Sequence, residues 1–133
     1  MKKEIVTLFL VFGLIGCVST PDKPQQAMSA SYYNMKDESF SLQAIAPMQI
    51  IREYAICKAI WFAEKKNAKK IALSDPKYDK QPRTPGTWGS EIHKGWGVLD
   101  TTAYLTEPKS TQNPFINVTE KASTCSNVWQ WYR

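Results

Sequence analysis

The sequence predicts an α+β domain in which one long helix packs on a small, mostly antiparallel sheet of about four strands. Three observations lead to this prediction. The segment 48–70 contains neither Gly nor Pro, while the segments 39–46 and 96–106 alternate in polarity as strands do. With 133 residues, of which 43% are hydrophobic and 22% charged, the chain suits one such domain and excludes collagen-like, coiled-coil and multi-domain architectures.

The first strand is predicted over 39–46, where apolar and polar residues alternate with Ile45 as the exception. Pro47 then suits the first position of a helix, so the helix is expected over 48–70, with a length of about 34 Å. Its middle is apolar nearly all round, which predicts cover on more than one side. Its end carries cations that suit the negative end of the helix dipole, namely Lys65, Lys66, Lys69 and Lys70.

A short strand is expected over 71–74, and together with the preceding strand and helix it could form a parallel crossover. The following stretch, 76–95, holds three prolines and three glycines and reads as a long loop. Loops of about 20 residues are usually functional, mobile or internally packed, so a binding surface is expected there. The segment 96–106 is a strand with Val98, Thr102 and Tyr104 on one face and Leu99, Thr101, Ala103 and Leu105 on the other.

The C-terminal third is expected to complete the sheet. A strand is predicted over 115–121, paired as a hairpin with the strand at 96–106. The segment 128–133 is either a last strand or a packed tail.

The N-terminus reads as a secretory signal peptide, because two lysines precede an apolar run at 5–15. The run has about eleven residues, whereas a membrane-spanning helix needs roughly 20, and the alternative is a short N-terminal core helix. The run ends in Leu14-Ile15-Gly16-Cys17, which resembles the lipobox of bacterial lipoproteins. The resemblance implies acylation of the Cys17 thiol, cleavage before Cys17 and acylation of the new amino terminus.

The lipoprotein resemblance also implies an address. Two or three acyl chains anchor a protein stably, whereas one does so only marginally. In this class an Asp after the lipidated Cys commonly signals retention at the inner membrane; here Val18 follows, so an outer-membrane location is expected in a Gram-negative cell. The expected organisation is signal peptide 1–16, lipidated Cys17 and flexible tether 17–38, and α+β domain 39–133. That domain resembles small single-helix envelope lipoproteins of unknown function in architecture alone.

With Cys17 lipidated, Cys57 and Cys125 remain in an oxidising compartment, which predicts a disulfide between them. The bond would fasten the long helix to the C-terminal segment. It would close a loop of about 69 residues, worth roughly 4 kcal/mol by chain entropy. Redox-active pairs typically occur as Cys-x-x-Cys, so the expected role is structural; two free buried thiols are the alternative.

The sequence offers little for catalysis, cofactors or metals. His93 is the only histidine, no serine lies in a nucleophile-elbow pattern and no glycine loop resembles a phosphate cradle. No catalytic residue, cofactor or metal site is therefore expected. A hydrolase would have to use two converging carboxylates. The acids available for such a pair are Asp75, Asp79, Glu91, Asp100 and Glu107.

The net charge of +5 is spread along the chain, which argues against a nucleic-acid partner. Without residues 1–16, two lysines and one glutamate are lost, and fifteen basic against eleven acidic side chains leave +4. That charge gives a modest attraction to anionic lipid or cell-wall polymers, or merely a soluble surface.

Aromatic residues in the second half could stack on sugar rings, although core packing is the commoner use. The candidate binding residues are Trp88, Trp96 and Tyr78. Three functions follow. The first is a non-catalytic envelope lipoprotein that binds a protein partner as an accessory subunit or inhibitor; the second is a cell-wall glycan-binding module; the third is a small carboxylate-dependent hydrolase.

Overall fold

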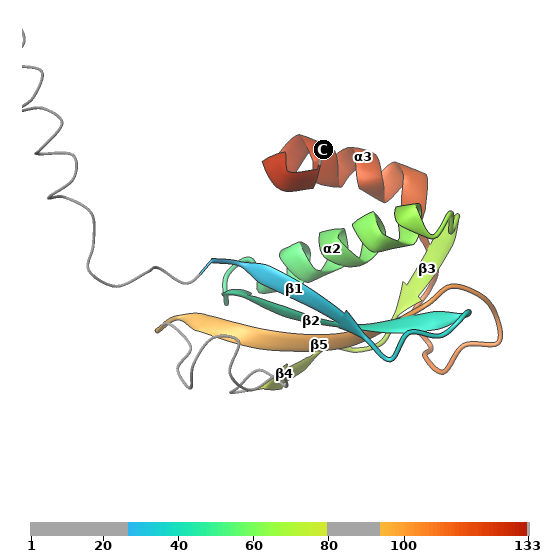
Figure 1. Cartoon of the computed structure of the whole chain (residues 1–133), viewed down its shortest axis with the longest axis horizontal. Coiled ribbons are helices and arrows are strands. Elements are labelled where there is room, and N and C mark those ends of the chain that lie inside the picture. Colours follow the sequence, from blue (N-terminus) through green and yellow to red (C-terminus); the bar gives the residue numbers. More distant parts are fainter. Residues whose placement is uncertain (1–26, 80–93, 133) are drawn as a thin grey trace, which may run out of the picture.

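The structure, a computed structural model, describes residues 27–79 and 94–132 (Figure 1). The predicted α+β class and mostly antiparallel sheet are confirmed, but the prediction of one long helix and about four strands is wrong. The described part contains two α-helices and six strands. The elements in chain order are β1 (Ser29–Tyr33), β2 (Ser39–Pro47), α2 (Ile51–Lys65), β3 (Lys70–Leu73), β4 (Lys77–Asp79), β5 (Trp96–Tyr104), β6 (Ile116–Asn117), α3 (Val118–Val128) and the 3-10 turn η1 (Gln130–Tyr132).

The sheet has the order β1-β2-β5-β3-β6, with β4 paired to β5. Its central pair is β2 with β5, which match from Ser39 opposite Tyr104 to Pro47 opposite Trp96. Because β2 and β3 are both antiparallel to β5, they are parallel to each other and α2 connects them across β5. This is the parallel crossover that the sequence allowed, except that β5 lies between its two parallel strands.

Both helices lie on one side of the sheet, with α2 along the sheet and α3 packed on α2 (Figure 1). The nearly all-apolar middle of α2 is therefore covered on two sides, as predicted. The largest fully buried side chains come from both layers: Tyr54, Phe40, Leu42, Ile51, Ile60, Ile71, Leu99, Val98 and Val118.

The expected tether 17–38 contains a strand, since Ser29–Tyr33 pairs with β2 along its whole length. Tyr32 explains why this segment is ordered. Its ring stacks on Phe62 with centroids 4.2 Å apart, and its hydroxyl donates a 3.0 Å hydrogen bond to the carbonyl of Lys58. The ordered domain thus begins about ten residues earlier than the sequence indicated.

Helix α2 is shorter at both ends than the predicted 48–70. Pro47 is the last residue of β2 instead of the first of the helix. At the other end Asn67 adopts a φ of 59°, and the amides of Asn67 and Ala68 donate to the carbonyls of Glu64 and Ala63. This paired bonding at a left-handed residue is the Schellman motif that ends helices.

The prediction of a strand over 115–121 is wrong beyond its first residues. Only Ile116–Asn117 is extended, and it pairs with β3 instead of β5. The side chain of Asn117 accepts a 2.9 Å hydrogen bond from the amide of Glu120 and so caps α3. Within α3 the buried positions are Val118, Ala122 and Cys125, which follow the i, i+4, i+7 spacing of one helix face. The last segment is a packed tail, one of the two forms expected.

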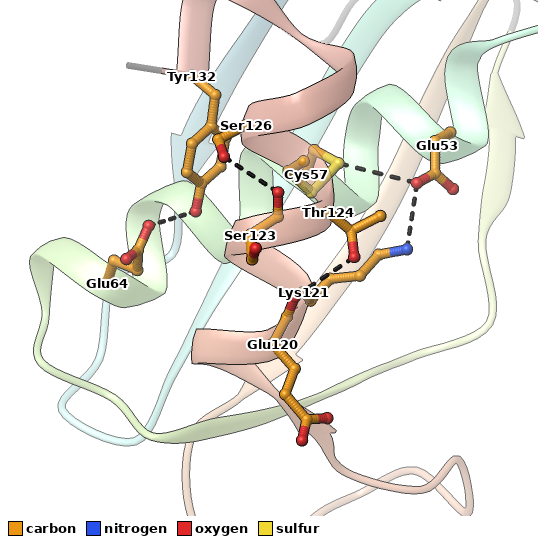
Figure 2. Close-up of a disulfide and its surroundings, with 10 residues drawn as sticks. Glu53, Cys57, Glu64, Glu120, Lys121, Ser123, Thr124, Ser126 and Tyr132 are labelled. Atoms are coloured by element: carbon orange, nitrogen blue, oxygen red, sulfur yellow. Dashed lines mark hydrogen bonds and ion pairs between the residues drawn. A yellow bond between two sulfur atoms is a disulfide. The ribbon is translucent and has the colours of Figure 1, made fainter.

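The predicted disulfide between Cys57 and Cys125 is present and joins α2 to α3 (Figure 2). Both cysteines are fully buried. Figure 2 shows two further links to α2, one from α3 and one from η1, on either side of the bond. Lys121 and Glu53 form a 3.1 Å ion pair, and the hydroxyl of Tyr132 donates to the carboxylate of Glu64.

Candidate functional site

Two hollows in the described part of the chain meet at an interruption between β3 and β4. These strands follow one another along the same edge of β5, with Leu73 opposite Ala103 and Lys77 opposite Asp100. We call the three residues between them, 74–76, the strand break. Pro76 has no amide hydrogen to donate to a ladder, and the residue before a proline is itself restricted.

Side chains hold the strand break against β5. Ser74 Oγ accepts a 2.8 Å hydrogen bond from the amide of Thr102, and Thr101 Oγ1 donates a 2.9 Å bond to the carbonyl of Ser74. The amide of Ser74 in turn donates to the carbonyl of Thr102 at 2.8 Å. The interruption is therefore a fixed part of the sheet.

The helix-side groove lies between α2, the strand break and residues 113–116, and has a volume of about 260 Å³. Its walls are mainly apolar, whereas Arg52, Asp75 and Asn113 supply polar groups. The side-chain Nδ2 of Asn113 donates a hydrogen bond to the carbonyl of Leu73 at 2.7 Å and another to Asp75 Oδ1 at 3.0 Å. These two bonds fix one wall of the groove to the sheet. The groove is consequently preformed. Its apolar lining includes Ala55, Ile56, Leu73, Leu99, Pro114 and Ile116.

The open-side hollow lies on the other face of the sheet and has a volume of about 400 Å³. Asp100 is its most buried charged residue, with 5% of its surface exposed. Its Oδ1 accepts a 2.6 Å hydrogen bond from the hydroxyl of Tyr33, and its Oδ2 accepts one from Gln43 Nε2 at 3.2 Å. Ser41 and Thr102 add hydroxyl groups 3.2 Å apart. This hollow is thus lined mainly by hydroxyl and carboxylate groups, and Asn34 and Lys77 also contribute to its lining.

The structure places two of the three candidate binding residues, Trp96 and Tyr78, on different faces of the sheet. Trp96 is four positions before Asp100 in β5, so both side chains lie on the open face of the sheet. Tyr78 is paired with Leu99 and therefore lies on the helix face. Tyr78 is 51% exposed, and its partner Leu99 lines the helix-side groove. Trp88 lies outside the described residues. Trp96 and Tyr78 therefore cannot form one stacking platform.

Two of the five candidate acids, Asp75 and Asp100, line the same open-side hollow. Asp79 ends β4 and Glu107 follows β5, while Glu91 lies outside the described residues, as does His93. Across residues 27–79 and 94–132, no group of three His, Cys, Asp or Glu side chains is placed to hold a metal ion.

The C-terminal tryptophans pack around Tyr54 in α2. The ring centroids of Trp129 and Trp131 lie 5.7 and 5.6 Å from that of Tyr54, and the Lys58 ammonium lies 3.9 Å above Trp131. Burial raises the pKa of Tyr54 to about 12 and lowers the pKa of Lys58. These tryptophans pack against the core, the commoner of the two uses considered.

Two polar residues of the helix-side groove, Arg52 and Asn113, were not among the candidates that the sequence offered. No local pattern brings them together, because one comes from α2 and the other from the connection that leads into β6.

The chain matches no known protein-family model, no curated protein and no solved structure. Fold and site define it as an α+β domain with a disulfide-linked helix pair and a hollow on either side of an interrupted strand. Within the described segments, no helix is long and apolar enough to cross a membrane. Cys17, the expected lipid site, lies outside those segments.

Proposed function

We propose that the chain is a non-catalytic, membrane-anchored bacterial envelope lipoprotein whose domain binds a protein partner as an accessory subunit or inhibitor. The observation that carries this proposal is the helix-side groove. Its volume of about 260 Å³ suits one or two side chains, and its walls are mainly apolar. Interfaces gain most of their affinity where a large side chain enters a well-packed pocket of this kind.

The polar groups of the groove give the partner an orientation. Arg52 is exposed on the first turn of α2, and Asp75 is exposed at the strand break. A partner that inserts an apolar side chain between them meets a cation on one element and a carboxylate on the other. Such charges fix register and speed up association more than they add affinity.

Two features support the envelope location. Stable structural disulfides belong mainly to oxidising compartments, and this one is fully buried between two helices. Only twelve residue-to-residue steps separate Cys17 from Ser29, where β1 begins, and they span at most about 40 Å. A lipid on Cys17 would therefore keep the domain close to the membrane, at the outer membrane in a Gram-negative cell because Val18 follows the cysteine.

The open-side hollow supports a second candidate function, the binding of a cell-wall glycan. Hydroxyl and carboxylate groups are the partners that sugar hydroxyls bind. The same hollow contains Asp75 and Asp100, which a carboxylate-dependent hydrolase would need. However, Asp100 accepts hydrogen bonds from Tyr33 and Gln43, so the domain itself holds this carboxylate in place, which suits ligand binding better than catalysis.

Cross-linking of the membrane-anchored protein in the cell that makes it, followed by mass spectrometry, tests the proposal. The control is Cys17→Ala, which removes the anchor. We expect a specific protein adduct from the wild type that is lost in the control. Recovery of peptidoglycan fragments alone would replace the leading proposal by glycan binding.

A further inference from the structure

Within the described residues, strand β1 is a sheet edge whose own sequence lacks the usual protection against pairing. It is the terminal strand of the order β1-β2-β5-β3-β6, and within residues 27–79 and 94–132 no strand follows on its outer side. Proteins usually protect edges by short length, charge, proline or a bulge in the strand itself, or by a covering helix or loop. β1 has five residues, SASYY, without charge or proline, in unbroken register with β2.

The edge at β4 provides the contrast. It has only three residues, two of which are charged, and it directly follows the proline of the strand break. All three are exposed. Strand β4 carries the protection that β1 lacks, so the difference between these two strands points to β1 as an association surface.

β1 is also held rigidly from within its own domain. Tyr32 bonds to the carbonyl of Lys58 beneath α2, and Tyr33 bonds to Asp100 on the open side. Both tyrosine hydroxyls thus reach inward over their own sheet, one on each face. An extended strand that is already ordered loses little conformational freedom when another strand adds to it.

We propose that β1 pairs antiparallel with β1 of a second copy, around a twofold axis at Ser31. This register places Ser29 opposite the partner's Tyr33 and Ala30 opposite the partner's Tyr32, so every tyrosine faces a small residue. No charged side chain meets its own copy, which would be unfavourable in a symmetric pair. The same patch serves both copies, as a twofold interface requires.

The lipid anchor is compatible with this dimer. The two Ser29 residues would lie four strand positions apart, about 14 Å, at opposite ends of the paired strands. Each is within about 40 Å of its own Cys17, so both anchors can enter one membrane. This compatibility rests on the proposed function, whereas the pairing of the strands does not. Anchoring in one membrane would raise the local concentration of the copies and favour the pair.

Sedimentation equilibrium of the lipidated protein in detergent tests the proposal. The solvent is matched to the density of the detergent, and the micelles are in large excess over the protein. At about 0.1 mM, where Kd values well above micromolar are detected, we expect the wild type at twice the monomer mass. Ser31→Glu and Ser31→Lys should each give monomers, because like charges then meet at the axis. Their equal mixture should restore the dimer, which also shows that both variants are folded.

A monomeric wild type, or Ser31→Glu that remains dimeric, would overturn the inference. Ile56→Glu, which places a charge in the helix-side groove, should remain dimeric. If the dimer is absent while the protein adduct persists, this inference fails and the proposed function stands. If the adduct is absent while the dimer persists, the proposed function fails and this inference stands.

Discussion

Removal of the disulfide is expected to destabilise the domain more than any other small change at the contact between the helices. The cysteines are 68 positions apart, so the bond closes a loop of 69 residues counting both. The chain-entropy relation gives about 4 kcal/mol for such a loop. Because both cysteines are fully buried, Cys57→Ala with Cys125→Ala also leaves unfilled space, which adds to the loss.

Urea unfolding of the double variant, followed by circular dichroism and tryptophan fluorescence, measures this loss. Other contacts keep α3 on α2, so the variant should still fold. The matched control is Glu53→Gln, which breaks the ion pair beside the bond. That pair is partly exposed, so the control should lose at most about 1 kcal/mol. A loss below about 1 kcal/mol in the double variant would refute the entropic reasoning.

Three further predictions concern β1, alkaline stability and the anchor. Tyr32→Phe should reduce the free energy of unfolding by about 1 kcal/mol, because it removes the bond to Lys58; an unchanged urea midpoint would contradict this. Burial raises the pKa values of Tyr32 and Tyr132 and raises the pKa of Tyr54 to about 12, so the unfolded chain loses these protons first, near pH 10. The contribution of these three protonated tyrosines to the free energy of unfolding is complete below pH 10 and declines as the pH rises toward 12. The lowered pKa of Lys58 opposes this only up to about pH 10.5. A Tm that stays constant from pH 10 to 12 would be inconsistent with these shifts. Intact mass spectrometry should find the mature chain beginning at an acylated Cys17, and an unmodified chain of 133 residues would contradict the anchor.

The sequence predicted those elements whose pattern is long and local. β2 and β5 each have nine residues with alternating faces, and the structure places Leu99 and Asp100 on opposite sides of the sheet as that alternation requires. The disulfide followed from the number of cysteines and the expected compartment. By contrast, β4 has three exposed residues, which carry no alternation.

Two elements were missed although the sequence contains a signal for each. Asn117 followed by Glu120 is a helix start, and buried residues at 118, 122 and 125 continue it, but the β-branched residues of 115–121 suggested a strand. In β1, Ala30 and Tyr32 alternate with serines, but the run is short and its composition resembles a linker. The strand becomes stable only through contacts of Tyr32 with a helix nearly thirty residues away.

The helix-side groove could not be predicted at all. It exists because β6 pairs with β3 instead of β5, which brings residues 113–116 beside α2 and the strand break. Long-range pairing of a two-residue strand leaves no periodic trace in the sequence. The site is therefore a consequence of topology, whereas the main strands reflect local pattern.

Site-specific photo-cross-linking in the anchored protein would show whether the helix-side groove binds a protein partner. One probe replaces Ile56 in the helix-side groove, and a matched probe replaces Val128, an apolar residue that is 61% exposed at the end of α3. We expect an adduct with one protein partner from position 56 and none from position 128. No protein adduct at position 56, or the same adducts from both positions, would contradict this expectation.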